Sequence, residues 1–214
     1  MSDWQYFLKR GFDICLAAFG LIAFGWLILI CWVISTLDTR QNGFYTQQRI
    51  GRNGVPFRII KIRTMHHVKG VTSVVTTRGD PRITRIGSLM RRFKLDELPQ
   101  LINVLTGQMS FVGPRPDVSG FADLLQGEDR IILSVRPGIT GPATLAFSNE
   151  EEMLANCDDP ERYNREVVYQ IKVRINRQYI QEYRFYKDLL YIMATLLPVL
   201  RRQVMSEIGG LTEL

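Results

Sequence analysis

The sequence has few of the residues that most often bind transition metals. It contains 3 cysteines and 2 histidines in 214 residues, and no two cysteines have the Cys-x-x-Cys spacing of a structural zinc site. An odd number of cysteines argues against a disulfide framework and fits a reducing compartment. His66 and His67 are neighbours on an expected strand, so their side chains point to opposite faces and are not expected to bind one metal together.

The glycine-rich loops of the common nucleotide-binding folds are also missing. There is neither a Walker A loop nor a Gly-x-Gly-x-x-Gly motif, so a nucleotide would have to be bound by other groups. The net charge of +6, from 27 Lys and Arg against 21 Asp and Glu, attracts nucleic acid, anionic lipid or phosphorylated substrates without choosing among them. No recognisable nucleic-acid-binding motif accompanies this charge, and we expect no nucleic-acid partner.

One long uncharged segment lies near the N-terminus. No charged residue occurs between Asp13 and Asp38, and a helix of its central 20 or so residues would extend roughly 30 Å, enough to cross a bilayer core. A buried core helix rarely stays apolar on every face for this length. Lys9 and Arg10 before the segment and Arg40 after it suit a helix that enters one leaflet and returns to the same side. The segment is therefore predicted to be a permanent membrane anchor.

The rest of the chain reads as one helix-rich domain with a small sheet. Two strands are expected around the turn Gly51–Gly54, and alternation places Lys61 and Arg63 on one face of the second strand. Apolar residues at helical spacing predict an amphipathic basic helix from Ile83 to Phe93. The expected fold class is α/β in the helix-rich α+β sense, with a small antiparallel sheet, amphipathic surface helices and the N-terminal membrane helix.

Two acids, Asp96 and Glu97, follow this basic helix side by side. Pro99 suits the first turn of a helix, so a new helix is expected to begin near Asp96. Adjacent residues on a helix point about 100° apart, so the two acids cannot oppose each other across a scissile bond as in glycosidases. One interpretation is a helix-capping acid followed by a first-turn glutamate. The other is a nucleophilic carboxylate beside a metal-binding one in a phosphate pocket.

Two loops rich in glycine and proline each hold one arginine, Arg115 and Arg136. An arginine fixed between prolines is a well-positioned ligand for an anion. Together with the basic helix and the membrane anchor, these loops indicate a phosphate pocket at a lipid surface. A cationic adaptor that binds anionic lipid without catalysis is the alternative, and it would not need Asp96.

Five motifs carry a resemblance to a known family: KRGFDICLAA, PFRIIKIRTM, RRFKLDELPQLINVLTGQMSFVGPRPD, VRPGITG and FYKDLLYIMATL. In this order and spacing they resemble the bacterial sugar transferases of the monotopic phosphoglycosyl transferase family, which are polyprenyl-phosphate hexose-1-phosphate transferases. The resemblance extends from Lys9 to Arg202. It implies an enzyme that transfers a sugar 1-phosphate from a UDP-sugar to undecaprenyl phosphate, releases UMP and initiates the assembly of a bacterial glycan.

The resemblance also implies roles for individual residues. Asp96 would be the nucleophile that forms a covalent phosphosugar intermediate, and Glu97 would complete the acidic pair and bind Mg²⁺. Asp188 matches a late acid of the family and is the second expected metal ligand. The remaining site residues are basic and are expected to contact the diphosphate or the lipid phosphate: Lys61, Arg63, Arg91, Arg115 and Arg136.

The family holds its catalytic domain on the cytoplasmic face of the bacterial inner membrane through a re-entrant helix. The corresponding division here is a membrane-embedded helix over 1–38, a catalytic domain over 39–202 and a tail over 203–214, with membrane lipids as partners and a homodimer left open. Many members break the re-entrant helix with Ser-Pro, where this chain has Gly25-Trp26. A second departure follows Pro142, in a region expected to bear on the choice of sugar.

Overall fold

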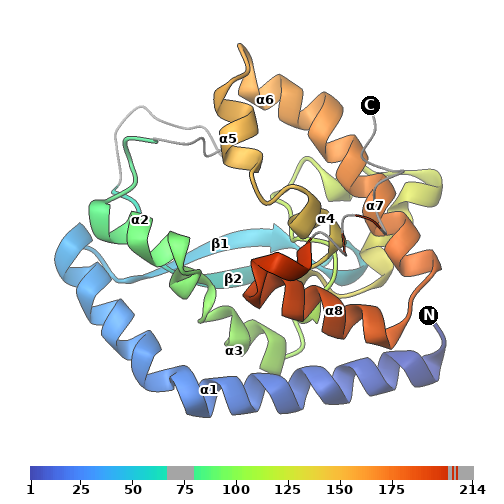
Figure 1. Ribbon diagram of the computed structural model, residues 1–214, viewed down its shortest axis with the longest axis horizontal. Helices are drawn as coiled ribbons and strands as arrows, with labels where there is room; N and C mark the ends of the chain where they lie inside the picture. Colours follow the sequence, from blue (N-terminus) through green and yellow to red (C-terminus); the bar gives the residue numbers. More distant parts are fainter. Residues whose placement is uncertain (67–79, 202–203, 205, 207–214) are drawn as a thin grey trace.

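The N-terminal segment forms one helix of 37 residues, α1 (Asp3–Thr39), in the computed structural model of the chain. A capping box starts it: the Ser2 hydroxyl accepts the Gln5 N–H, and the Gln5 side chain accepts the Ser2 N–H. The helix bends along its length but is continuous through Gly25 and Trp26 (Figure 1). The helix begins at Asp3, and so it includes residues before the uncharged segment, which starts only after Asp13.

The two faces of α1 differ in an unusual way. Its buried residues follow one another at three or four positions, except for the two-turn gap between Gly20 and Ile28, and are mostly small or polar: Lys9, Asp13, Ala17, Gly20, Ile28, Cys31, Ser35 and Thr39. Large apolar side chains point outward instead, among them Phe7, Ile22 and Leu37 at 73%, 84% and 74% exposed. A water-facing helix has the opposite pattern. By length and composition α1 is able to cross a membrane, and its outward face suits lipid.

The predicted hairpin is confirmed. Strands β1 (Phe44–Ile50) and β2 (Pro56–Ile62) pair antiparallel around the short turn η1 (Arg52–Gly54). Asn53 and Gly54 in this turn have positive φ angles of 58° and 78°, which the Asn-Gly pair tolerates well. The sequence did not predict the second pair of strands, β3 (Ser110–Val112) and β4 (Gly138–Thr140), which is short and parallel.

The β3–β4 pair brings together the two loops that hold Arg115 and Arg136, called here the first and the second arginine-proline loop. The Gly113 N–H donates to the Thr140 carbonyl at 3.0 Å, and the Gly138 N–H donates to the Pro114 carbonyl at 2.8 Å. A Cβ atom on Gly138 would lie 2.2 Å from the Gly113 nitrogen, so no side chain fits there. The loops are thus joined backbone to backbone, which requires glycine at the crossing.

The helix expected to begin near Asp96 starts as a 3₁₀ turn. Helix α2 (Arg85–Arg92) is capped by Thr84, and Lys94, at a positive φ of 57°, then reverses the chain. The next residues form a single 3₁₀ turn, η2 (Leu95–Glu97), and only after Pro99 does α3 (Gln100–Leu105) start. A helical run therefore does begin beside the acids, as predicted, but its first turn is 3₁₀ and it becomes α-helical only after Pro99, because the reversal at Lys94 leaves room for only one tight turn before the proline.

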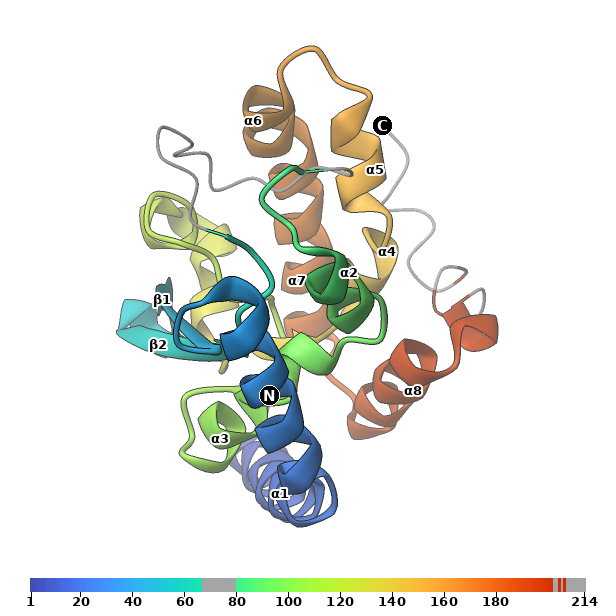
Figure 2. The same ribbon diagram turned by 90° about the vertical axis from the view of Figure 1, so that its left-hand side faces the viewer.

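The remaining elements are short helices and turns packed around α7. In chain order they are η3 (Ala122–Leu124), η4 (Gly127–Ser134), α4 (Pro142–Ala146), α5 (Glu150–Ala155), α6 (Pro160–Tyr163), η5 (Asn164–Val168), α7 (Tyr169–Gln181), α8 (Phe185–Leu196) and η6 (Pro198–Leu200). Ile171, Val173 and Ile175 of α7 belong to the main core, together with Ile132 and Leu133 of η4. Helices α5 and α6 lie at the end of the molecule farthest from α1 (Figures 1 and 2).

The structure describes residues 1–66, 80–201, 204 and 206. His67 and most of the expected tail over 203–214 lie outside this part of the chain. Within it, a helix-rich fold with a small antiparallel hairpin and one long apolar N-terminal helix agrees with the predicted fold class.

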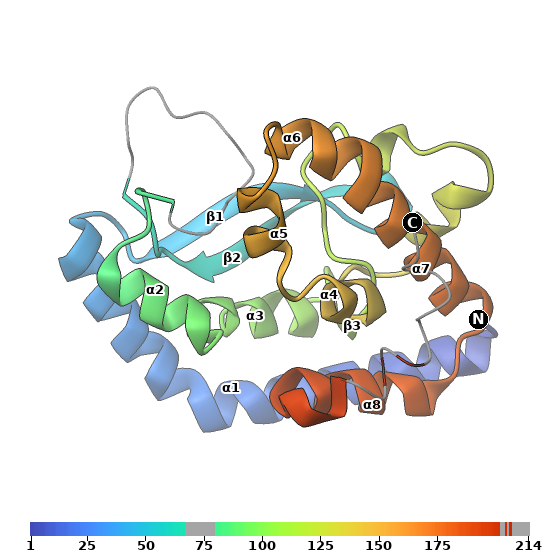
Figure 3. The same cartoon turned by 45° about the horizontal axis from the view of Figure 1, so that its top comes forward.

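The start of helix α8 lies beside the N-terminal part of α1 at one edge of the molecule (Figure 3), and a buried ion pair joins the two helices. The Lys9 ammonium donates to the Asp188 carboxylate at 2.5 Å, and the hydroxyls of Tyr179 and Tyr183 donate to the same carboxylate at 2.7 and 3.1 Å. On the next turn of α1, Asp13 accepts the Ser110 hydroxyl at 3.1 Å and the Phe111 N–H at 3.0 Å. Polar contacts therefore fix α1 to the rest of the domain.

Replacing Lys9 with methionine is expected to destabilise the fold by about 3–5 kcal/mol, because it leaves the buried Asp188 carboxylate without its cation. Thermal unfolding in detergent would measure the effect as a lower melting temperature. The double variant Lys9→Met with Asp188→Asn should recover part of the loss, since it leaves no unpaired charge. An unchanged melting temperature for Lys9→Met would contradict this role of the pair.

Candidate active site

Neither member of the acidic pair caps a helix. Asp96 and Glu97 are both 8% exposed, and no side-chain capping bond is made at the start of η2 or of α3. The capping interpretation of the pair is therefore wrong. Two buried carboxylates need another source of stabilisation, since a charge is costly to bury unless it is paired.

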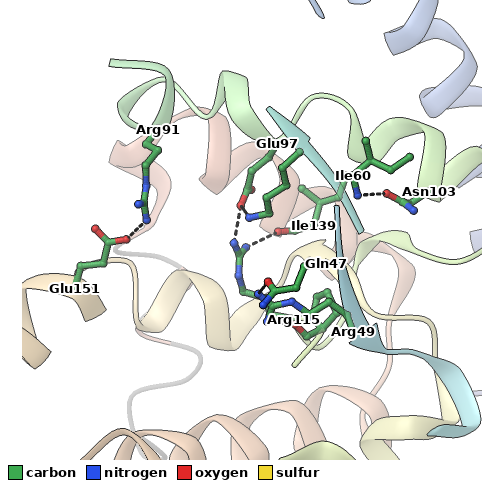
Figure 4. A network of polar contacts seen from close by, with 11 residues as sticks. Gln47, Arg49, Ile60, Arg91, Glu97, Asn103, Arg115, Ile139 and Glu151 are labelled. Atoms are coloured by element: carbon green, nitrogen blue, oxygen red, sulfur yellow. Dashed lines mark hydrogen bonds and ion pairs between the residues drawn. The ribbon is translucent and has the colours of Figure 1, made fainter. Parts of the chain in front are cut away.

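Glu97 obtains this stabilisation from two cations. Its Oε1 atom accepts from the Lys61 ammonium at 3.1 Å and from the Arg115 guanidinium at 2.5 Å (Figure 4). Burial alone would raise the pKa of the Glu97 carboxyl, but the charges of Arg115 and Lys61 outweigh it and hold that pKa well below its usual range. Glu97 is therefore ionised and holds together one residue of β2 and one of the first arginine-proline loop.

Asp96 is in a different electrostatic position. Burial and the neighbouring Glu97 charge raise the pKa of the Asp96 carboxyl, while Lys61, Arg91 and Arg115 act in the opposite direction. Within the described part of the chain, no hydrogen bond to its carboxylate is recorded. Asp96 thus lies in the field of three cations with no direct partner among the described residues, and its oxygens are available to a substrate.

A buried asparagine aligns the strand that carries Lys61. The Asn103 side chain on α3 accepts the Ile60 N–H at 3.0 Å and donates to the Arg58 carbonyl at 2.8 Å (Figure 4). These two bonds satisfy the edge of β2 with a side chain instead of a third strand. Because α3 follows η2 directly, the same contact sets Lys61 against Glu97.

A cavity of about 380 Å³ is lined by the two cations that contact Glu97, although neither acid is itself among its lining residues. Its lining includes the cations whose charges act on the two acids: Lys61, Arg91, Lys94 and Arg115. Residues from the region after Arg115 line the remainder and include Asp117, Phe121, Phe147, Tyr169, Lys172 and Asn176. Arg91 also forms an ion pair with Glu151 of α5 (Figure 4). The volume is in the range of small-molecule sites, and the cations make it suitable for phosphates.

Three of the predicted site residues lie elsewhere. Arg63 donates to the Asn42 carbonyl at 2.8 Å, and its guanidinium lies over the Tyr45 ring. Arg136 donates to the Gly107 carbonyl at 2.6 Å and to the Tyr6 hydroxyl. Both oxygens of Asp188 accept hydrogen bonds in the cluster with Lys9. None of the three residues lines the cavity, and their substrate or metal contacts stay predictions.

Several cavity residues were not predicted from the sequence. Arg49 of β1 holds the first arginine-proline loop by donating to the Pro116 carbonyl at 3.2 Å. Tyr169, Lys172 and Asn176 all lie on one face of α7, at spacings of three and four residues. The sequence could have indicated these residues. The face of α7 that buries Val173 also carries polar side chains, whereas a buried helix face normally contacts only the apolar core.

The donor set fits a magnesium ion only if the substrate shares it. No group of three or more His, Cys, Asp and Glu side chains able to hold a metal occurs among the described residues. Mg²⁺ commonly binds through one or two carboxylates, several waters and substrate phosphates. Glu97 uses Oε1 for its two cations, and no hydrogen bond to its Oε2 is recorded within the described residues. Glu97 beside Asp96 therefore fits such a shared ion, whereas the fully engaged Asp188 does not.

Comparison with known proteins gives relatives along most of the chain. Exopolysaccharide production protein ExoY of Sinorhizobium fredii is 32% identical over 204 residues, covering 88% of this chain and 83% of the relative. The UDP-glucose:undecaprenyl-phosphate glucose-1-phosphate transferase of Caulobacter vibrioides is 33% identical over 191 residues, covering 87% and 67%. The UDP-N-acetylgalactosamine-undecaprenyl-phosphate N-acetylgalactosaminephosphotransferase of Aeromonas hydrophila is 32% identical over 198 residues, covering 91% and 44%.

The family profile described as bacterial sugar transferase matches residues 4–202. This range includes α1, the acidic pair, both arginine-proline loops and α8. The resemblance expected from the five motifs is confirmed, and with it the assignment as a phosphoglycosyl transferase. The chain belongs to the bacterial sugar transferase family.

Proposed function

We propose that this sugar transferase moves a sugar 1-phosphate from a UDP-sugar to undecaprenyl phosphate, releases UMP and so initiates the assembly of a bacterial glycan. The names of the relatives support the reaction class: the Caulobacter protein is named for glucose and UDP-glucose, and the Aeromonas protein for N-acetylgalactosamine. Because these two sugars differ, the relatives do not indicate which sugar this chain uses.

The observation that carries the mechanism is the buried Asp96 carboxylate, which has no hydrogen-bond partner among the described residues, beside the paired Glu97. In the first step an Asp96 oxygen attacks the β-phosphorus of the UDP-sugar. The bond from that phosphorus to the bridging oxygen breaks, and UMP leaves with the electron pair. Lys61 and Arg115 are placed to stabilise the charge that develops on the phosphate oxygens. The product is an acyl phosphate between Asp96 and the sugar phosphate.

In the second step an oxygen of undecaprenyl phosphate attacks the same phosphorus. The acyl phosphate bond breaks, the Asp96 carboxylate is restored and the lipid diphosphate sugar is released. Both displacements occur at phosphorus, so the bond between C1 of the sugar and its oxygen is never broken. The anomeric configuration of the donor should therefore be retained in the product.

Glu97 is proposed to position Mg²⁺ and the substrate, and not to attack the phosphorus. Its Oε1 atom already accepts from two cations, which makes it a weaker nucleophile than Asp96. Together with the phosphates of the substrate, Glu97 would hold Mg²⁺ next to Asp96. The bound ion would neutralise charge on the diphosphate and so favour attack by an anion.

The outward faces of four helices support a position at the cytoplasmic face of the bacterial inner membrane. Besides α1, helix α8 exposes Tyr186, Leu196 and Leu197 at 61%, 69% and 47%, and α2 ends in an exposed Phe93. Helix α3 adds Ile102 at 38%. Undecaprenyl phosphate would approach the site along this surface, while the UDP-sugar arrives from water. The bend of α1 (Figure 1) supports a re-entrant anchor.

Replacing Asp96 with asparagine should abolish turnover and leave the fold intact, because the amide keeps the shape of the side chain but is not a nucleophile at phosphorus. UMP release would be followed with undecaprenyl phosphate, Mg²⁺ and a panel of UDP-sugars. Mass spectrometry of protein incubated without the lipid should find the phosphosugar adduct on wild type only. The exposed Asp158→Asn serves as the matched control. Full activity of Asp96→Asn would refute the mechanism and favour the non-catalytic adaptor.

Chelation of divalent ions should stop UMP release, and Mg²⁺ should restore it. Glu97→Gln is expected to raise the Mg²⁺ concentration for half-maximal activity by about tenfold or more, since a carboxylate ligand is lost. The measurement is a Mg²⁺ titration of UMP release by both proteins. Full activity in excess chelator would show that no divalent ion is needed.

Cysteine labelling should find both ends of α1 on the cytoplasmic side. Asp3→Cys and Gln41→Cys would be introduced singly into a chain whose native Cys15, Cys31 and Cys157 are replaced by serine. A membrane-impermeant thiol reagent should then modify both positions in inverted vesicles and neither in intact spheroplasts. Labelling of the two positions from opposite sides would demonstrate a spanning helix instead of a re-entrant one.

A further inference from the structure

The part of the cavity formed by α7 contains buried polar atoms that form no well-directed hydrogen bond with the described residues. The Tyr169 hydroxyl, the Asn176 Oδ1 atom and the Arg49 Nε atom are all buried without a hydrogen bond, and all three residues line the cavity. Tyr169 is 7% exposed and Asn176 is 5% exposed. Three such atoms in one cavity are unlike an ordinary protein interior, where buried polar atoms almost always have a partner.

These groups do not serve the packing of the fold. Tyr169 and Asn176 are seven residues apart on the same face of α7, with the buried Val173 between them. Phenylalanine and leucine would fill the same space without the cost of an unpaired polar atom. A polar ligand that supplies the missing hydrogen bonds would account for all three atoms at once.

Charged groups beside them add further hydrogen-bonding capacity. The Asp117 carboxylate acts on Arg49 through its charge, and it raises the pKa of the Tyr169 hydroxyl both through its charge and through a hydrogen bond that is too poorly directed to satisfy that hydroxyl. Lys172 is paired with Glu150 at 2.6 Å. This end of the cavity therefore offers the Asp117 carboxylate and the Asn176 oxygen as acceptors, Arg49 as a donor and the Tyr169 hydroxyl as either.

We propose that the α7 side of the cavity binds the hexose of the UDP-sugar, with Tyr169 and Asn176 in contact with its hydroxyls. This proposal rests on the proposed function and adds the place where the sugar is recognised. The cations Lys61, Arg91 and Arg115 line the same cavity and are suited to the diphosphate, so a group attached to the diphosphate is within reach of α7. Hexose hydroxyls both donate and accept and can satisfy every group there, whereas the uracil ring has a single N–H to offer. The ribose hydroxyls of uridine are the competing ligand, and inhibition by UMP tests for them.

The consequence is that Tyr169 and Asn176 determine which sugar is accepted. A site built to hydrogen-bond a substrate hydroxyl discriminates strongly against an epimer that misplaces it, because its own buried groups are then left unpaired. The choice of sugar is therefore expected to depend on residues of α7 and not on the acidic pair.

The test uses the full chain in detergent with undecaprenyl phosphate, Mg²⁺ and the four donors UDP-glucose, UDP-galactose, UDP-N-acetylglucosamine and UDP-N-acetylgalactosamine. Tyr169→Phe and Asn176→Leu should each lower kcat/KM for the best donor by about tenfold or more and flatten the preference among the four. Inhibition by UMP, which has no hexose, should be unchanged. The melting temperature of the unliganded variants should not fall, because each change removes an unpaired polar atom.

Tyr186→Phe, which removes an exposed hydroxyl from α8, is the matched control and should keep the wild-type preference. Equal weakening of donor use and UMP inhibition in Tyr169→Phe would place uridine and not hexose against α7, and would overturn the proposal. So would an unchanged preference in both cavity variants, which would mean that water satisfies these groups.

A separate measurement keeps the hexose site distinct from the transfer reaction. If wild-type protein releases no UMP from any donor, the proposed function fails, and the hexose site is judged by thermal shift. The proposal of a hexose site is supported if one of the UDP-hexoses raises the melting temperature of wild type more than UDP does, and if Tyr169→Phe removes that difference. It falls if UDP and all four UDP-hexoses stabilise wild type equally.

Discussion

The arrangement of the site depends on one buried carboxylate that two cations share. Glu97 draws Lys61 from β2 and Arg115 from the first arginine-proline loop to a single oxygen atom. Breaking either contact would leave a charge uncompensated in a buried place, so the strand, the loop and η2 are held in one geometry. The same pairing explains why the two adjacent acids have different surroundings. Glu97 makes the direct contacts with the two cations, whereas Asp96 is influenced only by their charge.

A second constraint comes from the lipid surface that the molecule is suited to face. Helix α1 turns its large apolar side chains outward and its small and polar ones toward the domain, so the anchor binds the domain through hydrogen bonds and close packing. Close packing of small residues and polar contacts are what hold helices together where lipid surrounds them. The acidic pair is connected to this surface through α3, which packs on α1 at Gly20 and Leu101.

Local patterns predicted the elements better than they predicted the direction of side chains. The Asn-Gly turn, the alternation of β2 and the spacing of α2 are properties of short segments, and the hairpin and helix followed from them. Arg115 and Arg136 have nearly the same Arg-Pro context, yet one meets Glu97 and the other meets Tyr6 and Gly107. That difference arises from the crossing of the two loops at β3 and β4, a long-range contact that no short segment encodes.

The contacts of α1 with the end of the chain also bear on how the protein is made. Lys9 and Asp188 are 179 residues apart, and Asp13 and Ser110 are 97 apart. At the usual pace of bacterial and eukaryotic synthesis, about 5–20 residues per second, the anchor leaves the ribosome on the order of ten seconds before the partner of Lys9 exists. During that interval its apolar face can enter the membrane while Lys9 stays hydrated at the surface. The domain then completes its folding on a helix that is already in place.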